Sequence, residues 1–336
     1  MANVDQVLID DWYVVARIED CPPNSIKSVR LLGEDLVLWR GSTSESPILA
    51  WQDRCPHRGT RLSLGKIVDD TFTCKYHGWA YNSAGQCVNI PSSGAQRPPT
   101  SICIKTYQCQ ECWGLVWVSL GNPSHDIPPF PEWDDPHYRK IYFGTHSHHF
   151  YSSPFRVFES IFDTSHFSFV HPGSLGTDTQ PEVREQIVEV KADSITIGNM
   201  EITQSSIGST GIDSRVSYTY KIYPPLTLYG YKESIKGKMT FLNTVTPIDE
   251  EESLVWGQLA MNYGHEIPKL EIAQFYDEAM SQDIPVVGSQ RPKLLPLLSQ
   301  NDSNTPWTSE VHAPCDQASI AYRRWLKKLG ITYGVC

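Results

Sequence analysis

Residues 55–77 read C-P-H-R-G-T-R-L-S-L-G-K-I-V-D-D-T-F-T-C-K-Y-H, a Cys-x-His pair and a Cys-x-x-His pair separated by sixteen residues. Two thiolates and two imidazoles in this order are typical of a [2Fe-2S] cluster. In such a cluster Cys55 and Cys74 would bind one iron, while His57 and His77 would bind the other. Because neutral imidazoles replace two thiolates, the reduction potential lies above that of an all-cysteine cluster. The stretch therefore predicts a centre that accepts electrons readily.

A structural zinc site is the main alternative, because zinc also binds two cysteines and two histidines. Zinc fingers place both cysteines before both histidines, whereas each pair here contains one of each. Gly59 and Gly78 follow the two pairs closely and let backbone amides approach the sulfurs. We therefore expect the iron-sulfur cluster rather than zinc.

Length and composition predict a cytoplasmic protein with two domains. The chain has 336 residues, no long apolar run, and an N-terminus without the basic and apolar regions of a signal peptide. Its net charge of -10 argues against nucleic acid as a partner, and we expect no membrane partner either. The cluster stretch itself is rich in cations, which predicts docking of an acidic ferredoxin at Arg54, Arg58, Arg61, Lys66 and Lys75.

Strand patterns dominate the first part of the chain and helical patterns the last. Residues 1–135 predict an all-β domain that carries the cluster and ends in a Pro-rich linker. Residues 136–336 begin with alternating, strand-like runs and end with helical patterns at 269–280 and 316–329. Strands followed by helices, without alternation, favour an α+β fold for this second domain.

A second metal site is indicated by Asp163-x-x-His166-x4-His171. Asp163 and His166 would share one helix face if a helix covered both. His171 lies about 140° further round an ideal helix, so both imidazoles can bind one metal only if the helix ends or distorts between them. The sequence His171-Pro172-Gly173 supplies such an ending.

Two imidazoles and one carboxylate on one face of iron leave positions open for oxygen chemistry. The best third ligand is Asp283, which shares an otherwise apolar helical stripe with Tyr276, Ala279 and Val287. Asp283 also precedes Ile284-Pro285 and could instead cap a new helical segment. Spacing alone gives the ligand and the cap similar weight.

The two motifs in this order resemble the α-subunits of Rieske non-haem iron oxygenases. The resemblance implies an N-terminal all-β Rieske domain, a catalytic domain of helix-grip type with an antiparallel sheet, a [2Fe-2S] cluster and a mononuclear Fe²⁺. It matches Asp283 to the late carboxylate ligand. It also implies a homotrimer in which Asp163 connects a cluster histidine of one subunit to an iron-bound histidine of its neighbour. Ser160 departs from the family pattern, which usually has Asn there.

Within this family the chain is most similar to saxitoxin-tailoring hydroxylases, at Asp11–Ala16, Pro131–Pro136 and Ala321–Leu326. The resemblance implies a monooxygenase that uses O2 and electrons from an external ferredoxin and reductase to hydroxylate a C–H bond of a small molecule. A guanidinium-bearing substrate would need carboxylates or aromatic faces. The candidates for these contacts are Asp213, Tyr218, Tyr220 and Tyr223.

Two other functions stay open from the sequence. The first is a demethylase or hydroxylase of an aromatic or chlorophyll-like compound. An anionic substrate of this kind would need Arg or Lys in the pocket to pair with its charge. The second is a protein that only transfers electrons. Iron content separates them, because an oxygenase holds three irons per chain and a carrier holds two.

Overall fold

The computed structural model describes residues 4–177, 179–183, 186–205, 213–223, 225–297 and 310–336. At 144–147, 205 and 213–214 only the backbone is described. The chain divides into two compact units, residues 1–126 and 127–336. The division falls within the Pro-rich stretch, residues 122–136, that was predicted to link the two domains.

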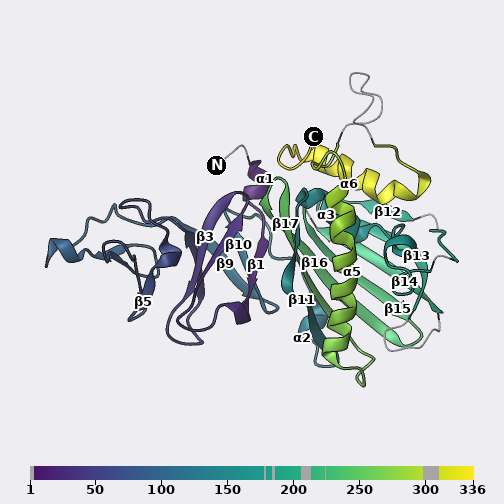
Figure 1. Ribbon diagram of the computed structural model, residues 1–336, viewed down its shortest axis with the longest axis horizontal. Helices are drawn as coiled ribbons and strands as arrows, with labels where there is room; N and C mark the ends of the chain where they lie inside the picture. Colours follow the sequence, from purple (N-terminus) through teal and green to yellow (C-terminus); the bar gives the residue numbers. More distant parts are fainter. Residues whose placement is uncertain (1–3, 178, 184–185, 206–212, 224, 298–309) are drawn as a thin grey trace. The chain divides into compact units, whose positions relative to one another are not determined.

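The first unit is built from two antiparallel sheets (Figure 1). The larger sheet has the order β1-β10-β9-β4-β3-β2, with bounds Tyr13–Arg17 (β1), Ile26–Leu31 (β2), Glu34–Arg40 (β3), Ile48–Gln52 (β4), Thr106–Cys112 (β9) and Leu115–Ser119 (β10). The smaller sheet has the order β5-β6-β7-β8, with bounds Lys66–Val68, Thr71–Thr73, Ala80–Tyr81 and Cys87–Asn89. Short helical turns complete the unit: α1 (Gln6–Ile9), η1 (Ile18–Asp20), η2 (Leu62–Leu64) and η3 (Pro91–Ser93).

An aromatic core lies beneath the cluster loops. Trp39, Trp51 and Phe72 are almost fully buried and meet edge to face or tilted, with ring centroids 4.9–5.6 Å apart. The same core contains Cys55 and Cys74. Such aromatic contacts add to the free energy gained by burying the rings. The two cysteines are therefore anchored on a rigid base.

The second unit is an antiparallel sheet with a long helix packed against it. The sheet order is β11-β17-β16-β15-β14-β13-β12, with bounds Arg139–Phe150 (β11), Ile187–Val190 (β12), Ile195–Ser205 (β13), Asp213–Tyr223 (β14), Thr227–Ser234 (β15), Gly237–Asp249 (β16) and Glu252–Met261 (β17). The helices are α2 (Pro131–Asp134), α3 (Pro154–Phe162), α4 (Phe167–Val170), α5 (Lys269–Ser289) and α6 (Gln317–Lys328), with the turn η4 (Pro314–Asp316). Figure 1 shows α5 running across the sheet face.

The predicted α+β class, with an all-β first domain and a helix-grip second domain, is confirmed. One part of the linker differs from its predicted extended form, because α2 forms within it. Glu132 of α2 accepts hydrogen bonds from Tyr229 and Lys238 on the neighbouring sheet strands, at 2.9 and 3.0 Å. Among the described residues, no helix is both long enough and apolar enough to cross a lipid bilayer.

Candidate functional site

The two loops of the first unit have the same backbone geometry. The amide of Gly59 donates to the carbonyl of Cys55 at 2.9 Å, and the amide of Gly78 donates to the carbonyl of Cys74 at 3.0 Å. Both glycines adopt a left-handed backbone, with φ of +72° and +71°, which a side chain would strain. The spacing of the motif thus produces two matching turns, each presenting one sulfur and one imidazole.

The two cysteines of the motif are buried, whereas the two histidines are more exposed. Cys55 and Cys74 are 3% and 2% exposed, whereas His57 is half-buried and His77 is exposed. The two imidazole rings lie 4.5 Å apart between centroids, and His57 stacks on Trp79 at 4.2 Å. Buried soft thiolates with an outer pair of imidazoles suit a Rieske cluster. Its histidine edge would face solvent, where electrons enter.

A buried hydroxyl points at one of the sulfurs. The oxygen of Tyr81 lies 3.3 Å from the Sγ of Cys55. Burial and this neighbouring sulfur raise the pKa of Tyr81, so the phenol stays neutral and can donate to a bound thiolate. Hydrogen bonds to cluster sulfurs raise the reduction potential.

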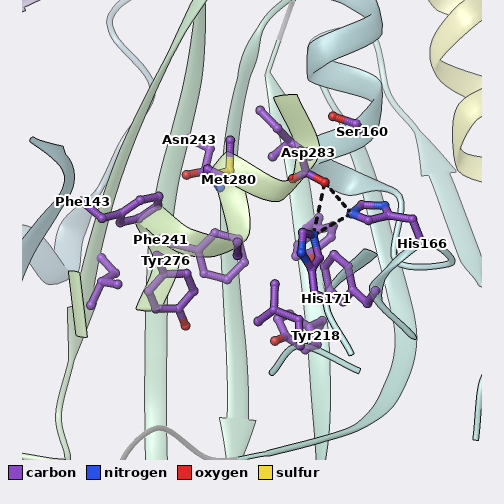
Figure 2. A pocket seen from close by; sticks show the side chains of 16 residues that line it. Phe143, Ser160, His166, His171, Tyr218, Phe241, Asn243, Tyr276, Met280 and Asp283 are labelled. Carbon is purple, nitrogen blue, oxygen red and sulfur yellow. Dashed lines mark hydrogen bonds and ion pairs between the residues drawn. The ribbon is translucent and has the colours of Figure 1, made fainter. Parts of the chain in front are cut away.

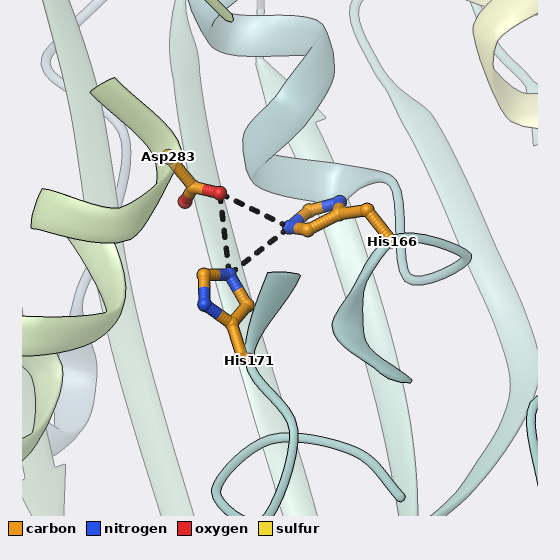
Figure 3. A group of neighbouring side chains, drawn as sticks. All are labelled: His166, His171 and Asp283. Atoms are coloured by element: carbon orange, nitrogen blue, oxygen red, sulfur yellow. Dashed lines mark hydrogen bonds and ion pairs between the residues drawn. The ribbon is translucent and has the colours of Figure 1, made fainter. Parts of the chain in front are cut away.

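The second site joins two histidines at the ends of α4 to a carboxylate on α5 (Figure 3). The Nε2 atoms of His166 and His171 are 3.2 Å apart. The Oδ1 of Asp283 lies 3.4 Å from the first nitrogen and 3.2 Å from the second. Adjacent ligands of an octahedral metal with bonds of about 2.1 Å stand about 3.0 Å apart. The three atoms therefore fit one face of a single iron.

The chain bends here in a way that differs from the helix predicted over Asp163 and His166. Helix α3 ends at Phe162, and Asp163 has an extended backbone, so these two side chains do not share a helix face. A separate short helix, α4, begins after His166 and ends before His171. The expected break at His171 is present, and it turns both imidazoles toward the same point.

His171 is oriented by a hydrogen bond to its second ring nitrogen, and His166 has a carboxylate near the same nitrogen. The Nδ1 of His171 lies 2.8 Å from the Oε1 of Gln282, and the Nδ1 of His166 lies 3.7 Å from the Oδ2 of Asp163. An Nδ1–H that donates to an oxygen leaves Nε2 as the free lone pair for a metal. Burial alone would lower the pKa of His171, but hydrogen bonds to Asp283 and Gln282 raise it.

Asp163 itself is partly accessible, with 36% of its side chain exposed. Its Oδ1 accepts the amide of Ser165 at 2.7 Å. Burial would raise the pKa of Asp163, yet the hydrogen bonds to His166 and Ser165 lower it overall. It is a carboxylate that touches the metal-binding histidine and still reaches the surface of its unit.

Helix α5 carries Asp283 as an internal residue. The helix runs without a break from Lys269 to Ser289, past Pro285, so Asp283 does not cap a new segment. Asp283 and Val287 are buried, as is Ala279 one turn before them, which is the stripe expected from the sequence.

A cavity of about 640 Å³, counting its open mouth, adjoins the three ligand atoms (Figure 2). Its walls are mainly aromatic and aliphatic: Phe143, Ile161, Phe167, Leu175, Tyr218, Tyr220, Phe241, Leu259, Tyr276, Ala279 and Met280. Polar groups enter at Ser160 and Asn243. Ser160 donates to the carbonyl of Val157 at 2.8 Å. The Oδ1 of Asn243 is buried and has no hydrogen-bond partner among the residues that the structure describes.

The four candidate substrate contacts fall in different places. Tyr218 and Tyr220 line the cavity. Tyr223 is absent from the described lining and stacks with Lys221 instead. Asp213 begins β14, and its side chain lies outside the described part of the chain.

Two residues near the site were not predicted from the sequence. His148 on β11 is buried, and its Nε2 lies 3.1 Å from the Oδ1 of Asp277. Lys232 is also buried, beside Tyr218 and Tyr276. The sequence signal that could have predicted this burial is strand parity, because Lys232 lies on the same face of β15 as the buried Leu228 and Gly230.

Comparison with known proteins places both halves of the chain in one kind of enzyme. Residues 11–108 match the Rieske [2Fe-2S] domain, and residues 152–331 match the vanillate O-demethylase oxygenase C-terminal domain. Methylxanthine N1-demethylase NdmA of Pseudomonas putida is 28% identical, over 97% of this chain and 92% of its own length. Toluene-4-sulfonate monooxygenase subunit TsaM1 of Comamonas testosteroni is 31% identical over 57% of this chain and 54% of its own length.

Solved structures agree with this. NdmA with caffeine superposes with a TM-score of 0.78 at 25% identity, covering 96% of this chain and 91% of that one. Dicamba monooxygenase bound to dicamba, at 21% identity, shares the fold with a TM-score of 0.80 over 97% and 98% of the two chains. The alternatives of a zinc-stabilised protein and of a pure electron carrier are therefore wrong. The chain belongs to the Rieske non-haem iron oxygenases whose catalytic domain is of the vanillate O-demethylase type, and it carries a [2Fe-2S] cluster and a mononuclear iron.

Proposed function

We propose that this oxygenase removes a methyl group from the nitrogen or oxygen of a small, flat aromatic compound. The observation that carries the proposal is the cavity, whose tyrosine and phenylalanine rings stand next to His166, His171 and Asp283. Aromatic walls favour a planar ring by stacking and edge-to-face contact. N- and O-demethylases among the relatives and family descriptions support the same choice.

The protein's own residues would bind, orient and shield the substrate. His166, His171 and Asp283 would hold the iron, which supplies the activation of O2 when bound. Gln282 keeps the imidazole of His171 in the metal-binding tautomer, and the carboxylate of Asp163 lies beside the Nδ1 of His166. The apolar walls exclude water around the methyl group, and Asn243 offers a buried carbonyl oxygen to a donor on the substrate.

The overall reaction balances with two external electrons. A methyl C–H bond gains one oxygen atom from O2, and the second oxygen atom leaves as water after taking two electrons and two protons. The resulting hydroxymethyl group then breaks its bond to nitrogen or oxygen and leaves as formaldehyde. The heteroatom keeps a proton, so the product lacks one methylene relative to the substrate.

Electrons would come from an external reductase and ferredoxin-like donor, as the sequence analysis expects. The oxidoreductase NdmD of Pseudomonas putida is 35% identical over 116 residues of this chain. The predicted docking residues Arg54, Arg58, Lys66 and Lys75 are exposed around the cluster loops. Reversing Lys66 and Lys75 to Glu should slow reduction by an acidic donor, and unchanged rates would remove this docking surface from the proposal.

The homotrimer, the cytoplasmic location and the role of Asp163 between subunits stay proposals that the resemblance supports. Hydroxylation of a saxitoxin-like guanidinium alkaloid receives no support from the relatives described above. Asp283 is the one carboxylate in the described lining of the cavity, and it is a candidate metal ligand, so a cationic substrate would have only aromatic faces to bind.

The test is product analysis with iron-loaded enzyme, a reduced donor and O2. The substrates are caffeine, vanillate and an uncharged methoxybenzene, with a guanidinium alkaloid panel alongside. We expect formaldehyde and a product that has lost one methylene from an aromatic substrate. His166→Ala should abolish both while the visible spectrum of the cluster persists. A product with one added oxygen, formed only from the guanidinium panel, would overturn the proposal.

A further inference from the structure

Lys232 is a buried lysine for which the described part of the chain provides no counter-ion. Its residue is 5% exposed, on the face of β15 that looks toward α5. Among the described residues, no carboxylate forms an ion pair with it and no acceptor takes a hydrogen bond from its ammonium. Buried charges are normally paired, because leaving water costs several kcal/mol. The described residues therefore leave the charge of Lys232 without a protein partner.

Two tyrosine rings separate Lys232 from the cavity. Its Nζ lies 5.8 Å from the ring centroid of Tyr218 and 5.9 Å from that of Tyr276. Both rings line the cavity. Cation–π attraction at these distances stabilises the ammonium partly, but it leaves the positive charge uncompensated. The charge therefore acts on whatever occupies the other side of the rings.

The position of Lys232 is also defined relative to the iron ligands. Tyr276 precedes Asp283 by seven residues on α5, a separation of about 10 Å along the helix axis. In Figure 2, Tyr276 lies beside Phe241 and away from Asp283, whereas Tyr218 lies on the far side of His171 from Asp283. A single aromatic ring with substituents at both ends spans such a distance. One end would then lie at the iron and the other at the tyrosines beside Lys232.

The described groups that line the cavity do not neutralise the positive charge of Lys232. Within the described lining, the charged or chargeable groups are His166, His171 and Asp283, which hold the metal. Tyr218 and Tyr276 stay uncharged because burial raises the pKa of both phenols. In an apolar cavity the attraction between opposite charges is much stronger than in water.

We propose that Lys232 determines the charge preference of the substrate cavity, selecting aromatic compounds with an anionic group opposite the methyl group and rejecting cationic ones. This inference rests on the proposed function, since it names the substrate class of the same cavity. Lys232 acts as a specificity-determining residue behind Tyr218 and Tyr276, and it takes no part in the reaction of O2.

Three probes of one shape test this charge preference: 4-methoxybenzoate, 4-methoxybenzamide and 4-methoxybenzamidine, with charges of -1, 0 and +1. Their dissociation constants are measured by titration calorimetry on the iron-loaded, oxidised holoenzyme. We expect the wild type to bind the benzoate at least about tenfold more tightly than the benzamidine. Lys232→Met should weaken benzoate binding about tenfold, change benzamide binding less than about threefold, and strengthen benzamidine binding.

The control variant is Lys236→Met, which removes the same charge from an exposed position on the same hairpin. It should leave all three constants unchanged. Lys232→Gln, with a neutral polar side chain, should behave as Lys232→Met and guards against an effect of the methionine itself. An equal loss for all three probes, no charge preference in the wild type, or no detectable benzoate binding at millimolar concentration would each overturn the inference.

Formaldehyde release from the same probes is measured separately. Charge-ordered binding that depends on Lys232, without formaldehyde, would contradict demethylation and leave the charge preference standing. Equal formaldehyde release from all three probes, unchanged in Lys232→Met, would support demethylation and contradict the charge preference. The two proposals can therefore fail independently.

Discussion

The amide of Gln282 fixes the ring of one iron-binding histidine. Its Oε1 lies 2.8 Å from the Nδ1 of His171, and its Nε2 donates to Glu278 at 3.2 Å, which orients the amide. We expect Gln282→Leu to lower the affinity for mononuclear iron by about 10–100-fold, the usual effect of removing such a partner. Iron content after dialysis against a weak chelator measures this.

The cluster serves as an internal standard for that experiment, because its ligands belong to the other unit of the chain. Its visible spectrum should be unchanged in Gln282→Leu. Ser281→Ala, an exposed neighbour that donates to a backbone carbonyl on α5, should keep its iron. If Gln282→Leu also retains iron as the wild type does, the hydrogen bond has no role in metal binding.

Lys232 makes a second prediction at the level of a single residue. Burial lowers its pKa from 10.5 to about 8. In the unfolded chain Lys232 keeps its proton up to about pH 10.5. Burying the protonated side chain therefore lowers the free energy of unfolding by its full amount below pH 8, and this loss of stability fades as the pH rises toward 10.5. Lys232→Met should therefore be more stable than the wild type at pH 7, by roughly 2–3 kcal/mol.

Urea unfolding of the catalytic unit between pH 7 and pH 10 checks this prediction. The gap between the two proteins should shrink steadily above pH 8. Lys236→Met, its exposed counterpart, should stay within about 0.5 kcal/mol of the wild type throughout. A destabilised Lys232→Met at pH 7 would mean that the buried ammonium is satisfied in the folded state.

At the scale of elements, close packing of Gly176 against the backbone of the short helix α4 fixes the position of that helix. A Cβ at Gly176 would lie 2.6 Å from the amide nitrogen of Ser168 and 2.7 Å from the carbonyl carbon of Phe167. These are backbone atoms, so the helix itself would have to move. Gly176→Ala should cost about 1–3 kcal/mol of stability and displace His166 and His171.

We expect Gly176→Ala to lose most of its mononuclear iron while the cluster spectrum persists. Iron per chain should fall from three toward two, measured by metal analysis. Gly198→Ala is the matched control, because its added methyl would meet no atom within 4 Å. Full iron content in Gly176→Ala would show that α4 tolerates the shift.

Elements also show where sequence reasoning succeeds. Alternation predicted strands in the first part of the second unit, and the apolar stripe of α5 predicted the burial of Asp283. The predicted helix end at His171 is present, but the break between α3 and α4 was not predicted, because the choice between one continuous helix and two depends on packing against the sheet and α5. His148 and Lys232 were missed for the same reason: polar residues in strands usually face solvent, and only the tertiary fold buries these two.

At the scale of the molecule, the order of the two metal motifs was sufficient to predict both cofactors and the family. The four cluster ligands lie within 23 residues and His166 and His171 within six, so local spacing determines their chemistry. Asp283 follows His171 by 112 residues, and spacing alone could not separate a ligand from a cap. The substrate is even harder to predict from the sequence, because the residues that line its cavity come from four strands and three helices.

Electron flow between the two centres provides a prediction for the whole enzyme. Asp163 contacts the Nδ1 of His166 and is also partly exposed, which suits a carboxylate that connects the iron site to a cluster histidine on a neighbouring subunit. Asp163→Asn keeps the size of the side chain but removes its charge. We expect both metal centres to remain, with product formation in a single turnover slowed by about a hundredfold, as for other misaligned catalytic contacts.

The measurement uses chemically reduced enzyme mixed with substrate and O2, and follows both the reoxidation of the cluster and the release of formaldehyde. Both rates should fall together in Asp163→Asn, because the oxidising centre no longer receives the cluster electron. Asp193→Asn, an exposed carboxylate at the turn between β12 and β13, should react as the wild type does. Fast cluster reoxidation coupled to normal product formation in Asp163→Asn would show that electrons reach the iron by a route that does not need this carboxylate.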